Sequence, residues 1–136
     1  LHMKAGGSVC PPSYFTVDNK MHYLHQEGRT VFKYAVSSMS DVSAAIAEKN
    51  GLTKDSINWI VPHQANQRII DFASTKLKVP KEKFYLNIHK YGNTSSASIP
   101  IALDELNRAG KLHRGDLLLL PAFGGGLASA CCLVRW

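Results

Sequence analysis

The stretch DLLLLPAFGGGLASACCLVRW, residues 116–136, carries the clearest fold signal in this chain of 136 residues. Its leucine run, Leu117–Leu120, is a continuous apolar segment of the kind found in strands that are buried on both faces. Three glycines, Gly124–Gly126, follow, and a second strand-like segment runs from Leu127 to Trp136. We therefore expect two strands joined by a glycine turn, with the last strand antiparallel to its neighbour.

Upstream of this hairpin, strand-like and helical patterns alternate. Short runs rich in β-branched and aromatic residues predict strands, and apolar residues at a spacing of three and four predict helices. The predicted elements are a helix at 31–49, a strand at 57–61, a helix at 64–78, a strand at 84–88 and a helix at 99–110. Pro100 should kink the last helix or delay its regular start. Residues 1–28 are rich in turn formers and indicate an irregular connection. The order predicts an α/β domain in which helices are layered on a mixed, mostly parallel sheet.

Composition excludes several classes of protein. With 45% hydrophobic and 19% charged residues, the chain is typical of an ordinary folded domain. No apolar run reaches the roughly 18–20 residues of a membrane span, and the first residues show no hydrophobic leader, so we expect a cytoplasmic protein without membrane contact. The net charge of +6 raises nucleic acid as a partner, but the basic residues are dispersed and match no nucleic-acid motif. An acidic protein or a phosphorylated ligand fits the charge at least as well.

The cysteines and histidines suggest no redox or metal centre. Cys10, Cys131 and Cys132 are an odd number without a CxxC spacing, and we expect buried free thiols. His22 and His25 are three residues apart in a turn-rich segment, without Cys or carboxylate partners at ligand spacing, so a metal site there is a weak alternative and we expect none.

Polar groups follow each predicted strand of the alternating part. His63 comes after the first strand, Asn93 after the second, and Gly124–Gly126 after the third. Ligands of open α/β sheets bind beyond the carboxyl ends of the strands, so an imidazole, an amide and backbone N–H groups could surround one oxyanion. Taken singly, each group has a simpler explanation: a structural or surface histidine, a helix N-cap and a tight connection.

Several segments resemble one known family. Val61–Asn66, with Arg68–Ile70, and Lys90–Ser95 are similar to the two signature segments of β-ketoacyl-acyl-carrier-protein synthase III, a condensing enzyme of the thiolase type. Further similar segments occur in the family's order, at 4–8, 28–33 and 123–136, so the resemblance covers essentially the whole chain. It implies a thiolase-like half, in which residues 29–136 form the C-terminal condensing-enzyme domain and residues 1–28 are the tail of the N-terminal half and the connection.

The resemblance also implies an activity. The complete enzyme is an acyltransferase that takes an acyl group from acyl-CoA onto a cysteine and condenses it with malonyl-acyl-carrier protein, losing carbon dioxide and starting fatty-acid synthesis. That cysteine belongs to the N-terminal half, so Cys10, Cys131 and Cys132 are not expected to replace it, and this chain alone should be inactive. The implied partners are the N-terminal half, acyl carrier protein, CoA thioesters and, at full length, a second copy in a homodimer; no cofactor is implied.

Site residues follow by the same resemblance. His63 and Asn93 would donate hydrogen bonds to the enolate oxygen, and the backbone N–H near Gly125 would contribute to a second oxyanion hole. Residues of the channel for CoA or the phosphopantetheine arm would be Asn66, Gly28 and Phe32, although Phe32 could equally be a core residue. The acidic carrier protein would be received by Arg68, Lys33, Lys76 and Lys78, for which an ordinary solvated helix face is the alternative.

One motif departs from the family pattern. After the glycines the family usually continues Phe-Thr-Trp-Gly, whereas this chain has Leu127–Ala130. Smaller side chains near the acyl pocket leave the acyl-chain preference open. A related β-ketoacyl synthase of secondary metabolism is therefore one alternative, and a non-catalytic fragment that binds carrier protein or CoA is another.

Overall fold

The computed structural model describes all residues from Leu1 to Trp136, in two compact units, Leu1–Phe32 and Lys33–Trp136. The boundary falls inside α2 (Gly28–Lys49), so the first turns of this helix belong to the first unit. None of the helices combines the length and the apolar character needed to cross a bilayer. The division of the chain into a connection and a C-terminal domain at residue 28 stays a prediction.

The first unit contains short elements where the sequence indicated only an irregular connection. Strands β1 (His2–Met3) and β2 (Leu24–His25) pair antiparallel, with His2 opposite His25. Helix α1 (Tyr14–Asp18) begins with a capping box, in which the hydroxyl groups of Ser13 and Thr16 bond each other's backbone N–H. Such reciprocal capping satisfies N–H groups that a short helix leaves free, which explains why this turn-rich segment still forms a helix.

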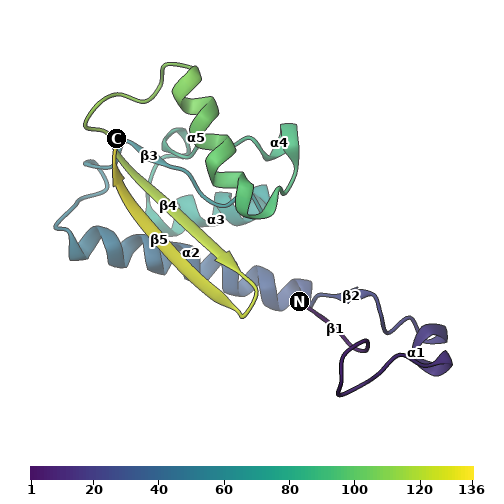
Figure 1. The fold of residues 1–136 in the computed structure, drawn as a ribbon. Coiled ribbons are helices and arrows are strands. Elements are labelled where there is room, and N and C mark those ends of the chain that lie inside the picture. Colours follow the sequence, from purple (N-terminus) through teal and green to yellow (C-terminus); the bar gives the residue numbers. More distant parts are fainter. The chain divides into compact units, whose positions relative to one another are not determined.

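The second unit is built on a three-stranded sheet in the order β3–β4–β5 (Figure 1). Strand β3 (Trp59–Ile60) runs parallel to β4 (Leu117–Gly124), and β5 (Ala128–Arg135) runs antiparallel to β4. A parallel bridge between Ile60 and Phe84 adds one further pairing. The predicted mixed sheet of an α/β fold and its antiparallel last strand are therefore confirmed, although the longest pairing is the antiparallel one between β4 and β5. Leu118 and Leu119 are 0% and 1% exposed although they point to opposite faces, as expected for a central strand.

Helices cover both faces of this sheet. On one face, α5 (Ser98–Arg108) contributes Ala102 and Leu106 to a buried cluster that also contains Val61, Leu112 and Leu118. On the other face, α2 runs along the hairpin, and Tyr34 Oη donates to Ser129 Oγ at 3.3 Å. Helix α3 (Gln67–Leu77) is joined to α2 by an ion pair of 2.8 Å between Lys76 and Asp41.

The predicted strand at 84–88 is wrong in length. Only Phe84 pairs with the sheet, between η1 (Lys81–Lys83) and α4 (Ile88–Tyr91). The buried side chain of Gln64 accounts for this, because its Nε2 donates to the Tyr85 carbonyl at 3.1 Å and its Oε1 accepts from the Asn87 N–H at 3.1 Å. One side chain thus satisfies backbone groups that would otherwise extend the ladder.

The predicted helices are confirmed with shifted starts. Helix α2 begins three residues before the predicted Val31, at Gly28, and ends as predicted at Lys49. Helix α3 begins at Gln67 rather than Gln64, because the Gln64 side chain is committed to the Tyr85–Asn87 backbone. The last helix is preceded by η2 (Ser95–Ala97), and Pro100 lies in the first turn of α5, where its missing N–H breaks no helical bond. Because α5 begins at Ser98, one residue before the predicted start, Pro100 does not delay the helix.

Candidate functional site

Three segments of the second unit meet at His63. Its backbone N–H donates to the Pro121 carbonyl of β4 at 2.9 Å. Its ring Nδ1 lies 2.7 Å from the Ser98 hydroxyl at the start of α5. Its ring also packs edge to face against Phe123, with centroids 5.5 Å apart. The segment after β3, the start of α5 and the end of β4 therefore come together at His63.

The position of His63 follows from the sheet. The Val61 N–H donates to the Leu119 carbonyl at 2.8 Å, so the parallel pairing with β4 continues beyond β3 to the histidine. The side chain is half-buried, and this burial lowers the pKa of the imidazole from its usual 6.5. A buried imidazole without a carboxylate neighbour favours its uncharged form, since desolvation penalises the cation. At neutral pH, His63 is thus a neutral ring with one N–H donor.

Ser98 is a site residue that the sequence analysis missed. It is 2% exposed, and its Oγ also accepts a bond of 3.3 Å from the Gln64 N–H. A signal for its burial was present, because Ser98, Ala102 and Leu106 repeat every four residues and form the inward face of α5. Nothing in that spacing, however, indicated His63 as its partner.

Asn93 lies in an exposed turn between α4 and η2. Its Oδ1 accepts from the Ser95 N–H at 2.8 Å, and its Nδ2 makes no hydrogen bond within the chain. The preceding Gly92 has φ +68° and ψ −157°, a conformation that favours glycine because it lacks a Cβ. The amide is consequently anchored by its oxygen, with its N–H₂ group left as a donor.

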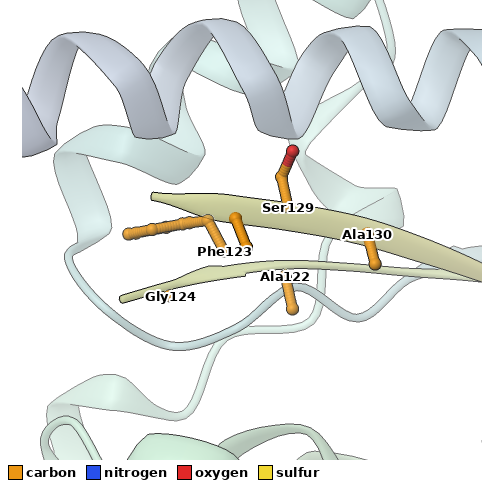
Figure 2. A pocket seen from close by; sticks show the side chains of 6 residues that line it. Ala122, Phe123, Gly124, Ser129 and Ala130 are labelled. Atoms are coloured by element: carbon orange, nitrogen blue, oxygen red, sulfur yellow. The ribbon is translucent and has the colours of Figure 1, made fainter. Parts of the chain in front are cut away.

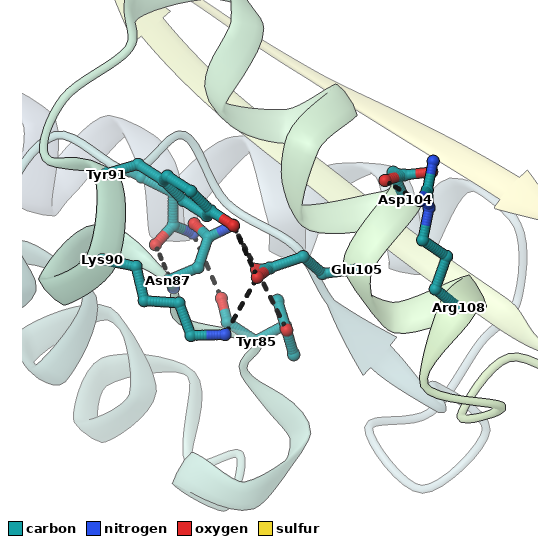
Figure 3. Close-up of polar contacts among 8 residues, drawn as sticks. Tyr85, Asn87, Lys90, Tyr91, Asp104, Glu105 and Arg108 are labelled. Carbon is teal, nitrogen blue, oxygen red and sulfur yellow. Dashed lines mark hydrogen bonds and ion pairs between the residues drawn. The ribbon is translucent and has the colours of Figure 1, made fainter.

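A polar cluster, which we call the Glu105 clasp, holds the segment before Asn93 against α5 (Figure 3). The Glu105 carboxylate accepts bonds of 2.8–3.2 Å from four donors, namely Tyr85 Oη, Asn87 Nδ2, Lys90 Nζ and Tyr91 Oη. The bond from Lys90, and next that from Asn87, lower the pKa of Glu105 from 4.5 to about 2. The sequence analysis did not identify this clasp, which directly precedes the Gly92–Asn93 turn.

A hollow lies at the turn end of the hairpin (Figure 2). It is lined by Ala122, Phe123, Gly124, Ala128, Ser129 and Ala130. Phe123 joins this hollow to His63, since its ring contacts the imidazole. The small side chains that depart from the family pattern therefore line a space next to the histidine.

The other predicted site residues lie at varied places. Gly125 is exposed in the turn between β4 and β5, and the Asn66 side chain caps α3 by accepting from the Arg68 N–H at 2.9 Å.

The residues predicted to receive the carrier protein lie on α2, on α3 and at the C-terminal end of α3. Lys76 forms an ion pair with Asp41, Lys78 is the left-handed C-cap of α3, and Lys33 and Arg68 are exposed. Gly28 and Phe32 belong to the first unit, at the start of α2. The roles suggested for these residues stay predictions.

The thiols are free, as expected, but not all are buried. Cys10 and Cys131 are partly buried, whereas Cys132 is exposed because neighbouring residues of β5 point to opposite faces. Burial raises the pKa of Cys131 to about 11, so its thiol is protonated at neutral pH and is a poor nucleophile. In the first unit, His22 Nε2 lies 2.9 Å from Thr16 Oγ1, and no group of three or more His, Cys, Asp or Glu side chains gathers anywhere in the chain.

Solved structures share this fold. The chain is similar to the 3-oxoacyl-[acyl-carrier-protein] synthase III of Aquifex aeolicus, with a TM-score of 0.82 and 50% identity over 85% of this chain and 37% of that one. The class defined by the fold is therefore that of the thiolase-like synthases, of which this chain matches a part.

Sequence comparison leads to the family. The chain is 65% identical to "Beta-ketoacyl-[acyl-carrier-protein] synthase III 2" of Bacteroides thetaiotaomicron and 62% identical to the corresponding synthase III of Phocaeicola vulgatus, in each case over its whole length and 40% of the relative's. Residues 47–136 match the family described as "3-Oxoacyl-[acyl-carrier-protein (ACP)] synthase III C terminal". The chain belongs to this family. It spans about two fifths of the length of the curated relatives that it matches.

Proposed function

We propose that this chain forms the enolate-stabilising part of a β-ketoacyl-acyl-carrier-protein synthase III, an acyltransferase that condenses an acyl group from acyl-CoA with malonyl-acyl-carrier protein. The observation that carries the proposal is the meeting of the segment after β3, the start of α5 and the end of β4 at His63, whose Nδ1 is bonded to Ser98 and whose Nε2 makes no bond within the chain. The membership of residues 47–136 in the synthase III family supports the same reaction class.

The proposed chemistry places the donors where negative charge develops. As the malonyl thioester loses carbon dioxide, the electron pair of the broken C–C bond passes to the neighbouring carbonyl, whose oxygen becomes an enolate oxygen. Two neutral donors, Nε2–H of His63 and Nδ2–H of Asn93, stabilise that oxygen. The enolate carbon then attacks the carbonyl of the acyl group on the cysteine, a C–C bond forms, the C–S bond to the cysteine breaks, and the cysteine leaves as a thiolate. Removal of one such donor typically costs about 2.7–4 kcal/mol of transition-state stabilisation.

The thiol that carries the acyl group is assigned to the part of the relatives that this chain does not span. Cys131 is disfavoured as that nucleophile, since its pKa is raised to about 11. Gly125, in the exposed turn beside the hollow, is proposed to offer its backbone N–H to the acyl carbonyl. The hollow itself is proposed to receive the acyl chain.

The partners belong to the same proposal. Arg68, Lys33, Lys76 and Lys78 are proposed to receive the acidic carrier protein, and Asn66, Gly28 and Phe32 to line the channel for the phosphopantetheine arm. Of these four side chains, Lys76 is the least available to the carrier protein, because Asp41 already holds its ammonium group at 2.8 Å. A cytoplasmic location and a homodimer of the full-length protein complete the proposal.

The test combines this chain with the first three fifths of the Bacteroides thetaiotaomicron relative and measures release of carbon dioxide from malonyl-acyl-carrier protein. We expect activity from the combination and none from this chain alone. His63→Ala and Asn93→Ala should each lower the rate on the order of 10²–10³-fold. Matched controls are the exposed residues His113→Ala and Asn107→Ala, which should leave the rate unchanged.

The outcomes separate the alternatives. Activity that survives both site substitutions contradicts the enolate assignment. Turnover by this chain alone contradicts the assignment of the nucleophile to the remaining part. Binding of carrier protein without any decarboxylation, by a combination that folds as shown by circular dichroism, favours a non-catalytic binding fragment.

A further inference from the structure

Ser98 is the buried partner of the proposed donor ring, and its hydrogen-bonding capacity is limited. A serine hydroxyl has one hydrogen to donate and two lone pairs to accept with. The Gln64 backbone N–H can only donate, so the bond of 3.3 Å between Gln64 N and Ser98 Oγ uses a lone pair of Ser98. The hydroxyl hydrogen then remains for the second neighbour, Nδ1 of His63 at 2.7 Å.

The opposite arrangement leaves a buried group unsatisfied. If Nδ1 carried the proton and donated to Ser98, both lone pairs of the hydroxyl would be used and its hydrogen would need another acceptor. Ser98 is 2% exposed and has no third hydrogen-bond partner in the chain. The cost of leaving a buried donor unsatisfied is sufficient to favour one histidine tautomer over the other by roughly an order of magnitude.

We propose that Ser98 is a positioning residue that donates to Nδ1 of His63 and thereby keeps the imidazole in the tautomer that carries its proton on Nε2. This inference rests on the proposed function for its consequence in the reaction, and on the Ser98 contacts alone for the tautomer. In the other tautomer, Nε2 presents a lone pair where the enolate oxygen needs a donor.

Two further contacts hold the His63 ring and the Ser98 hydroxyl in the positions that this hydrogen bond needs. Phe123 packs edge to face against the imidazole, with the ring planes at 68°, and so restricts the orientation of the ring. The Gln64 N–H, in the residue next to His63, holds the Ser98 oxygen in place from the same strand end. Ser98 also begins α5, so the hydroxyl is supplied by an element that is packed on the sheet through Ala102 and Leu106.

The tautomer can be read directly from the ring nitrogens of His63 in this chain. Long-range ¹H–¹⁵N spectra at pH 7.5 distinguish a protonated ring nitrogen from one that only accepts. We expect the wild-type protein to show Nδ1 as the acceptor and Nε2 as the protonated nitrogen. Ser98→Ala should shift the ring towards a mixture of tautomers, and Ser98→Thr, which keeps the hydroxyl, should restore the wild-type pattern. The control Ser96→Ala removes an exposed serine from the same segment and should change nothing.

Several results would overturn the proposal. A protonated Nδ1 in the wild-type protein contradicts it without any variant, so the test does not depend on the folding of Ser98→Ala. An unchanged tautomer pattern in a folded Ser98→Ala protein also contradicts it, as does a Ser98→Thr protein that behaves like Ser98→Ala.

The activity assay separates this inference from the proposed function. In the combined protein, Ser98→Ala should lower kcat on the order of tenfold with little change in KM, a smaller loss than the 10²–10³-fold expected for removing a donor outright. Ser98→Thr should recover most of the rate. If the spectra agree but His63→Ala keeps full activity, the proposed function fails and the tautomer assignment stands. If His63→Ala abolishes activity while Nδ1 is protonated, the function stands and the role of Ser98 fails.

Discussion

His63 and Asn93 are proposed to serve one oxyanion, yet their surroundings differ in kind. His63 is half-buried, continues the parallel pairing of β3 with β4, and is held by Ser98 and Phe123. Asn93 is exposed, and its turn follows a segment that is tied to α5 by the Glu105 clasp. The imidazole is thus supported by the sheet and its apolar core, whereas the amide is supported by polar contacts at the surface. The comparison teaches that the two proposed donors are held by different forces, one by burial against the sheet and the other by a cluster of charged and polar side chains.

Loss of core packing should have the largest effect, because it removes the support of His63. Leu118 is fully buried in the cluster with Val61, Leu106 and Leu112. We expect Leu118→Ala to lower the free energy of unfolding by about 2–5 kcal/mol, from the lost burial and the cavity left behind. Urea denaturation measures this. Val9→Ala, at a fully exposed position, is the control, and a loss for Leu118→Ala as small as that of the control would contradict the core's role.

Lys83 tests whether polar contacts also support the strand that leads to His63. Its ammonium group donates to the carbonyls of Lys54, Asp55 and Ile57, the last at 2.6 Å, just before β3. Lys83→Met should lower the free energy of unfolding by about 1.5–3 kcal/mol, because carbonyls that bond a charged group lose their donor. Lys81→Met is the matched control, since Lys81 makes an exposed ion pair with Asp71 that is worth about 0–1 kcal/mol. Equal losses for the two variants would show that β3 does not depend on Lys83.

Glu105 tests the support of Asn93. In Glu105→Gln the side chain keeps an acceptor but loses its charge and brings an N–H₂ group against existing donors. We expect a loss of about 1–3 kcal/mol in the free energy of unfolding. Asp104→Asn, which affects an exposed pair with Arg108, is the control with a loss of about 0–1 kcal/mol. If Glu105→Gln behaves like this control, the clasp does not hold the segment before Asn93.

The Glu105 carboxylate should also make the free energy of unfolding depend on pH in the acidic range. The pKa of Glu105 in the folded protein is about 2, below its ordinary 4.5, because Lys90 and Asn87 bond the charged form. The unfolded chain therefore binds the proton first, and the stabilisation is complete above pH 4.5 and is lost as the pH falls towards 2. Unfolding measured between pH 6 and pH 3 should show a steeper loss for the wild-type protein than for Glu105→Gln. Parallel curves for the two proteins would contradict this.

The smallest effect on stability is expected at Asn93 itself. Asn93→Ala removes one exposed bond, from the Ser95 N–H to Oδ1, and should cost no more than about 0.5–1.5 kcal/mol. Asn107→Ala is again the control. Thermal unfolding should show a small loss of stability for Asn93→Ala, although the same variant is expected to lose most of its decarboxylation activity. That result would distinguish Asn93 from the His63 site, which depends on the core. A large loss of stability would instead show that the amide is part of the scaffold.

Much of the fold followed from local pattern. The run Leu117–Leu120 predicted the central strand, Gly124–Gly126 the hairpin turn, and apolar spacing the helices α2, α3 and α5. Periodicity reports which side of an element is buried, and this is why these predictions survived. The strand at 84–88 failed for a reason that no local pattern contains, because the side chain of Gln64, some twenty residues earlier, satisfies its backbone.

The sequence by itself determined the order of the elements, the family resemblance and the two candidate donors, His63 and Asn93. Only the tertiary structure decided that Ser98 lies against His63, that Phe123 packs on its ring, and that Glu105 holds the segment before Asn93. These contacts join residues from separate elements, and hydrogen bonds between them depend on distances and directions that the packing of α5 on the sheet creates. A sequence motif can name the groups that do chemistry, but their protonation and orientation are set by neighbours that only folding brings together.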